Sequence, residues 1–204
     1  MSTMTNVSTL PAHPALRRFI EAIQPLWGER LTDAARWAKV GEYLPVMLDD
    51  RDLQARATDW PDTRAPDGKH TNLLFYEDPH HRFVINALVK WTGAVTPVHD
   101  HAHTWTSYSV LSGSERVVRY ALEEDGPVGA IGKLRETGAY TVRPGFVDVV
   151  PPHVPHAEYA GDARTVALIV RSERIGTFNH RMWHHATKEH FLAPGPSQVP
   201  FVLT

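Results

Sequence analysis

Two histidines separated by a single residue, His99 and His101, are the side chains in this sequence with the clearest chemical potential. They belong to GAVTPVHDHAHTWTSYSVLSG, residues 93–113, which continues into a strand-like run. Alternate residues of a β-strand face the same way, so two imidazoles at this spacing can converge on one ion. The pair therefore predicts one half of a metal site.

A second segment supplies candidates for the other half. GAYTVRPGFVDVVPPHVPHAEYAG, residues 138–161, contains a tight turn at Pro144-Gly145, a short strand and then His153 and His156. Two strands distant in sequence can thus bring a third imidazole to the pair, and three neutral imidazoles suit zinc, copper, iron or nickel. The residues alone leave open which of the two histidines is the third ligand.

The elements around these segments change character along the chain. Apolar residues recur at helical spacing from Pro14, and a second helical stretch is expected from Thr32 to Leu48, with Thr32 or Asp33 as its N-cap. After a polar loop at 57–69, short strand-like runs follow one another, which predicts a β-sandwich or barrel. These runs are 70–76, 82–91, 104–111, 115–122, 139–143, 146–150, 156–160 and 164–171.

We therefore expect one domain over residues 1–204. Residues 1–13 are polar and expected to be flexible, and 14–56 should form a helical cap. The β-barrel is expected over 70–183, followed by a C-terminal extension at 184–204 in which His184, His185 and His190 are expected on the surface.

Composition excludes several classes of protein. The chain has no cysteine, so disulfides, cysteine-ligated zinc and iron–sulfur clusters are excluded. The formal net charge of −2 gives no basic excess for nucleic acid. The sequence contains no run of about 18 apolar residues, so no membrane span is expected. The N-terminus does not resemble a signal peptide. These features favour a cytoplasmic protein that acts on a small molecule, and they leave assembly into a homo-oligomer open.

The two histidine segments resemble the two motifs of the cupin superfamily. The sequence PPHVPHA at 151–157 is especially similar, and His156 follows Val-Pro as the family's third ligand does, whereas His153 takes the place of a turn residue. The resemblance implies a mainly β fold, the cupin jelly-roll or double-stranded β-helix barrel, with His99, His101 and His156 as metal ligands. Four residues match the first motif at the family spacing: Gly93, His99, His101 and Gly113. Four approximate the second motif, whose glycine spacing is irregular here: Gly138, Pro144, Gly145 and His156.

A narrower resemblance covers most of the chain. The stretch NLLFYEDPHHRFVINALVKWTGAVTPVHDHAHTW at 72–105, the helical segment before the barrel, and ERIGTF at 173–178 look like the bacterial thiol dioxygenases that oxidise cysteine or 3-mercaptopropionate. This implies one iron(II) on three histidines, with zinc or nickel able to replace it in a purified sample. The substrate thiolate would bind the iron, and dioxygen would oxidise its sulfur to a sulfinate.

The remaining family active site is altered in this chain. The family's Ser-x-His-x-Tyr segment corresponds to Ala167, Ile169 and Arg171. Asn72 replaces an arginine that binds the substrate carboxylate, and Thr106 stands where some members have a crosslinked cysteine and where the first cupin motif usually has a glutamate. An apolar wall without that arginine predicts poor turnover of cysteine, because a carboxylate in a pocket needs a charge partner.

Several residues are candidates for substrate binding, while no catalytic residue is assigned. Arg171 could replace the missing arginine or be a surface residue at a strand end. Glu158 could be a fourth ligand, a base or a partner of a ligand, or simply a paired buried or surface carboxylate. His103 and Trp105 are expected near the pocket mouth. The full set of substrate-binding candidates is Arg171, Tyr108, Thr106, Asn72, His70, Glu158 and Ile169.

Three functions are consistent with these features. The first is a non-haem iron(II) dioxygenase of the thiol dioxygenase-like group with an altered substrate. The second is a metal-dependent cupin with another reaction, such as carbon–carbon cleavage of a diketone-like substrate, which an apolar wall beside the metal would allow. The third is a cupin that binds a small ligand or senses metal without catalysis.

Overall fold

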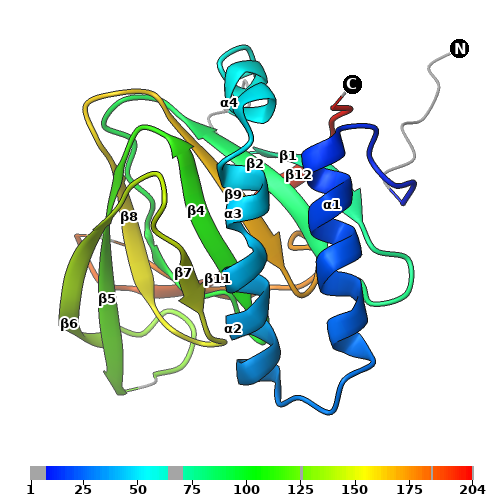
Figure 1. Ribbon diagram of the computed structural model, residues 1–204. Coiled ribbons are helices and arrows are strands. Elements are labelled where there is room, and N and C mark those ends of the chain that lie inside the picture. The colour runs from blue at the N-terminus through cyan, green and yellow to red at the C-terminus, as the bar shows by residue number, and fades with distance from the viewer. Residues whose placement is uncertain (1–7, 64–70, 125, 185, 204) are drawn as a thin grey trace, which may run out of the picture.

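The computed structural model describes residues 8–63, 71–124, 126–184 and 186–203 (Figure 1). Helical segments come first, and strands follow. The helical segments are α1 (Pro14–Ile23), the 3₁₀ turn η1 (Gln24–Trp27), α2 (Asp33–Tyr43), α3 (Pro45–Leu48) and α4 (Arg51–Ala57). The strands are β1 (Thr71–Glu77), β2 (Val84–Lys90), β3 (Val98–His99), β4 (Thr106–Ser112), β5 (Glu115–Glu124), β6 (Lys133–Val142), β7 (Asp148–Val150), β8 (His156–Ala160), β9 (Thr165–Arg171), β10 (His180–Trp183), β11 (His190–Ala193) and β12 (Ser197–Pro200).

The strands form two six-stranded sheets with the orders β12-β1-β2-β9-β4-β7 and β11-β10-β3-β8-β5-β6. Neighbouring strands are antiparallel except for β12, which runs parallel to β1. Chain-distant strands lie side by side in both sheets, as in β2-β9-β4 and β3-β8-β5. The predicted fold class is confirmed: the protein is mainly β, with two sheets in a jelly-roll-type arrangement and an N-terminal helical region.

The first sheet separates two hydrophobic clusters because its side chains alternate between its faces. On β9, Leu168 and Val170 pack with the helices, in a cluster that also contains Leu16 and Phe19 of α1. Ala167 and Ile169 point the other way, into the barrel, where they pack with side chains of both sheets. Helices α1 and α2 therefore cover the outer face of this sheet, with β5, β6 and β8 on the far side (Figure 1).

The helical region differs from the prediction at one point. Thr32 caps α2 as expected, its Oγ1 accepting from the Ala35 amide at 3.2 Å. The stretch from Thr32 to Leu48 is nevertheless two helices, because Pro45 has no amide hydrogen to continue α2 and instead begins α3. Most of the segment expected to be flexible lies outside the described residues, but its last residue, His13, is buried and caps α1.

The C-terminal part contributes strands to both sheets. Residues 184–204 were expected to be an extension, but they supply β11 and β12, the edge strands of the two sheets. The prediction that His190 is a surface residue is wrong: it is 6% exposed and stacks on Trp183 with 5.4 Å between ring centroids. His184 is exposed as predicted, and His185 lies outside the described residues. No helix in the described part of the chain is long and apolar enough to cross a membrane.

Candidate metal centre

Strands β3 and β8 bring the histidines of the two segments together. His99 and His156 are directly opposed in the antiparallel β3–β8 pair, and His101 follows in the turn after β3. The ring centroids are 4.5 Å apart for His99 and His156, 4.7 Å for His101 and His156, and 5.3 Å for His99 and His101. One potential ligand atom from each ring lies within 4.8 Å of the other two.

The Nδ1 atom of each imidazole already has a partner. His99 Nδ1 is 3.0 Å from the Pro97 carbonyl oxygen, and His156 Nδ1 is 2.9 Å from that of Val154. Because a carbonyl oxygen only accepts, both Nδ1 atoms carry the proton. Thr106 Oγ1 is 3.1 Å from His101 Nδ1 and can accept in the same way. The three Nε2 atoms are therefore left as the donors for an ion.

Burial keeps these imidazoles neutral. It lowers the pKa of His99 to about 4, with His156 adding to the effect. Burial also lowers the pKa of His101 well below its usual value, and the nearby charge of Arg171 lowers it further. Burial lowers the pKa of His156 as well. A metal binds the neutral imidazole, so the ring nitrogens are in the correct protonation state at pH 7. Three such donors in one buried cluster fit a divalent transition-metal ion.

His153, the competing candidate, is placed away from this cluster. Its side chain is 58% exposed, and its backbone has a φ of 61°, as in a turn. Asp100, which lies between His99 and His101 in the sequence, is fully buried. It accepts hydrogen bonds from the Ala102 amide at 3.0 Å and from Arg181 Nε at 2.8 Å. These bonds hold the turn that carries His101.

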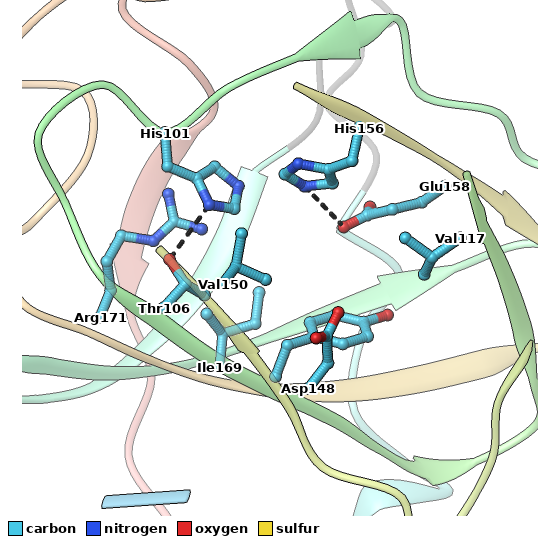
Figure 2. Close-up of a pocket in the computed structure, with 10 residues that line it drawn as sticks. His101, Thr106, Val117, Asp148, Val150, His156, Glu158, Ile169 and Arg171 are labelled. Atoms are coloured by element: carbon cyan, nitrogen blue, oxygen red, sulfur yellow. Dashed lines mark hydrogen bonds and ion pairs between the residues drawn. The ribbon is translucent and has the colours of Figure 1, made fainter. Parts of the chain in front are cut away.

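A pocket opens from the histidines into the barrel (Figure 2). Most of the predicted site residues contribute to it, but Asn72 does not. Asn72 is buried, and the structure shows no hydrogen bond to its Oδ1 among the residues it describes. His70 lies outside the described residues. The lining residues are His101, Thr106, Tyr108, Val117, Asp148, Val150, His156, Glu158, Ile169 and Arg171.

Arg171 lies inside the barrel, beside His101 and opposite Thr106 in the β4–β9 register. It is 4% exposed, and its Nε has no hydrogen-bond partner among the described residues. Burial lowers its pKa to about 10, partly offset by Glu158, so the guanidinium remains charged at neutral pH. The alternative of a surface arginine is therefore excluded, while its role in substrate binding stays a prediction.

A buried lysine, which sequence reasoning missed, lies between two carboxylates. Lys90 Nζ is 3.0 Å from Glu115 and 2.5 Å from Glu158 Oε2, and the Tyr108 hydroxyl donates to Glu115. Burial acts to raise the pKa of Glu158, but Lys90 and the nearby imidazoles outweigh it and bring the pKa to about 2. Burial raises the pKa of Glu115 and keeps Tyr108 in its phenol form. The only sequence signal was a lysine ending the apolar strand VINALVK.

A second charge cluster borders the pocket on the other side. Arg119 lies opposite His156 in the β5–β8 register and donates to Asp148 at 2.5 Å and to the Tyr140 hydroxyl at 2.8 Å. Tyr140 also donates to Asp148. Asp148 therefore has its own cationic partner, which leaves the Arg171 guanidinium available to another anion.

Three further residues near the site differ from expectation or were not predicted. His103 and Trp105 do not line the pocket: the His103 side chain is 57% exposed and 3.1 Å from Glu173, and Trp105 packs against the core between helices and sheet. His180 is buried, with its ring centroid 6.1 Å from that of His99. Its position on β10, which pairs with β3, could not be read from the sequence.

Comparison with solved structures gives partial similarities. The chain is similar to the cupin domain of Cnp3 from Schizosaccharomyces pombe, with 13% identity and a TM-score of 0.39, over 50% of this chain and 64% of that chain. The chain is also similar to oxalate oxidase in complex with the substrate analogue glycolate, with 21% identity and a TM-score of 0.41, over 57% of this chain and 56% of that chain. A third similar structure is hydroquinone 1,2-dioxygenase PnpCD in complex with Cd²⁺ and 4-hydroxybenzonitrile, with 14% identity and a TM-score of 0.42, over 57% of this chain and 68% of that chain. The first two matches cover less than two thirds of those chains, and no protein-family model matches.

Proposed function

We propose that this protein is a non-haem iron(II) dioxygenase that oxidises a small anionic substrate, with thiols as the first class to test. The observation that carries the proposal is the cluster of three imidazoles, two buried and one half-buried, whose Nδ1 atoms have partners and whose Nε2 atoms face one another beside a charged, buried Arg171. Iron(II) on His99, His101 and His156 would activate both a thiolate and dioxygen. The overall reaction adds both oxygen atoms to sulfur, so that a thiolate and O₂ give a sulfinate.

Charge balance in the pocket supports an anionic substrate. The buried and part-buried cations Lys90, Arg119 and Arg171 are matched by the carboxylates Glu115, Glu158 and Asp148. With neutral imidazoles, a divalent ion would thus add two uncompensated positive charges in a region of low dielectric. A substrate with one anionic donor for the metal and a second anionic group for Arg171 would neutralise both.

The residues of the chain would orient the substrate and exclude water. Arg171 can bind a carboxylate through two parallel hydrogen bonds, because its guanidinium is planar. Val117, Val150 and Ile169 form the apolar part of the pocket wall. They would contact the hydrocarbon part of the substrate and keep solvent from the reacting atoms.

The apolar wall also favours a second candidate, a dioxygenase that cleaves a carbon–carbon bond in a diketone-like substrate. Ala167 and Ile169 have no polar group to contact a thiolate, and both belong to the hydrophobic cluster in the barrel. A diketone enolate would provide an anionic oxygen donor instead of sulfur. Binding of a small ligand without turnover is the third outcome for the same pocket.

A metal analysis joined to oxygen uptake tests the proposal. Protein purified without added metal is assayed for metal content, loaded with iron(II), and supplied with a panel of small thiols that carry a carboxylate, then with diketones. We expect about one metal per chain. Uptake of one O₂ for each sulfinate formed would support the thiol reaction. Oxygen uptake only with diketones would select the second candidate. Binding of a test compound without oxygen uptake would contradict the proposal that the protein is an enzyme.

A further inference from the structure

The two carboxylate oxygens of Glu158 have different surroundings. Oε2 is 2.5 Å from Lys90 Nζ, inside the barrel. Oε1 points towards the histidine cluster and is 3.9 Å from His156 Nε2, the atom left free for metal binding (Figure 2). Glu158 follows His156 at a spacing of two on β8, so strand alternation puts both side chains on the same face.

The surrounding contacts hold this carboxylate in place. Lys90 is 1% exposed and is bound on its other side by Glu115, which in turn accepts from the Tyr108 hydroxyl. The backbone of Glu158 is fixed by Thr96, whose Oγ1 accepts from the Glu158 amide at 2.9 Å and whose own amide donates to the Glu158 carbonyl at 3.0 Å. These contacts orient Glu158 towards the histidines. A shift of its carboxylate would complete a four-ligand set, because Glu158 is not among the residues whose ligand atoms all lie within 4.8 Å of one another.

The distance between Oε1 and Nε2 suits two ligands of one ion. Histidine nitrogen and carboxylate oxygen each lie about 2.0–2.2 Å from a bound transition metal, which puts two ligands about 3 Å apart at a right angle and about 4.2 Å apart when opposite. The observed 3.9 Å between Glu158 and His156 falls within this range. The other two carboxylates near the pocket have their own partners, since Glu115 is bound by Lys90 and Tyr108, and Asp148 by Arg119 and Tyr140.

We propose that Glu158 is a fourth protein ligand of the metal, with Oε1 on the ion and Oε2 held by Lys90. This inference rests on the proposed three-histidine site. Four protein ligands leave two positions of an octahedral ion, enough for one donor atom of the substrate and for dioxygen. The second anionic group of the substrate then has no place on the metal and binds to Arg171. Substrates are accordingly expected to carry one metal donor and one separate anionic group.

Metal affinity measured by competition with a chelating dye tests the proposal, with cobalt(II) and zinc(II) as probes. Glu158→Gln should weaken binding by about tenfold or more, while the matched change Glu124→Gln, at a 73% exposed side chain, should change it by less than about threefold. Glu158→Asp keeps the charge but withdraws the oxygen, so it should also weaken binding about tenfold or more. Normal affinity in Glu158→Asp would overturn direct ligation, because a purely electrostatic role tolerates that change.

A zinc-loaded crystal structure of the unaltered protein gives a direct answer that does not depend on whether the variants fold. The proposal expects Oε1 within about 2.0–2.2 Å of the ion. An Oε1 more than about 3 Å from a zinc ion held by the three histidines would overturn it and leave the proposed function intact. Unchanged metal binding in His101→Ala would instead contradict the three-histidine site itself. Failure of the Glu158 proposal and failure of the proposed function are therefore distinguishable.

Discussion

Thr106 and Arg171 lie directly opposite each other on strands β4 and β9, and both side chains are beside His101. The Thr106 hydroxyl contacts the Nδ1 atom of His101, and the Arg171 charge contributes to the low pKa of the same imidazole. One register pair thus connects the metal ligand to the cation that we expect to bind the substrate. Each member can be tested separately.

Thr106→Val should weaken metal binding without unfolding the protein. Valine has the same shape but no oxygen to accept from His101 Nδ1, and loss of such a partner of a ligand typically costs 10–100-fold in metal affinity. Thr106→Ser keeps the hydroxyl and should retain most of the affinity. Competition with a chelating dye measures both variants, and equal affinities for valine and serine would contradict the role of the hydroxyl.

Arg171→Met should weaken binding of an anionic substrate by about one to two orders of magnitude, since a charge-assisted hydrogen bond contributes about 1.5–3 kcal/mol. Metal content should not change. The effect should appear in KM or in a direct titration with a carboxylate-bearing thiol. Arg135→Met, a matched change at a 60% exposed side chain on β6, serves as the control. Equal loss in both variants would remove Arg171 from the substrate site.

His99→Ala, His101→Ala and His156→Ala should each abolish stoichiometric metal binding and leave a folded barrel. The reason is that each variant removes one of the three imidazole donors that form the cluster among the described residues. Metal content after loading and dialysis is the measurement, with far-UV circular dichroism as the check on folding. His153→Asn is the control, because asparagine tolerates the positive φ of this turn. Metal loss in His153→Asn with normal content in His156→Ala would show that His153 is the ligand.

Acid should weaken the protein partly through Asp78, which lies away from the metal centre. Burial acts to raise the pKa of this carboxyl, but its hydrogen bonds outweigh burial and lower the pKa below 3.8. A carboxyl whose pKa is lower in the folded state than in the unfolded state stabilises the fold at pH values above its unfolded pKa. This stabilisation is lost as the pH falls through the folded pKa. Asp78→Asn should therefore lower the Tm at pH 7, and the difference should shrink below about pH 4. The donors to Asp78 are Gln24, Tyr76 and the amides of His80 and His81.

Local patterns predicted the fold better than they predicted the pocket. Strand alternation is a property of neighbouring residues, which is why Ala167, Ile169 and Arg171 could be assigned one common face, as the structure has them. The short strands β10 and β12 depend on pairing with residues about 80–125 positions away, such as Asn72 with Gln198, and no local signal indicates such pairing. The metal ligands remain predictions, but their imidazoles lie together because β3 pairs with β8.

Lys90 shows why the rest of the site was missed. A lysine at the end of an apolar strand usually extends its amine to solvent, and only the positions of Glu115 and Glu158, contributed by other strands, show that it is buried. The partners lie 25 and 68 residues away in sequence. Buried ion networks are therefore a property of tertiary packing, and a single sequence contains no direct signal for them.

Lys90→Met should destabilise the fold by about 3–5 kcal/mol, because it leaves two buried carboxylates without a cation. The free energy of unfolding from urea denaturation is the measurement, with metal removed so that metal binding does not contribute. Adding Glu115→Gln removes one of the uncompensated charges and should restore part of the loss. Lys133→Met is a matched control at an exposed side chain and should leave the urea midpoint unchanged. If Lys90→Met is as stable as the control, the buried network does not stabilise the barrel.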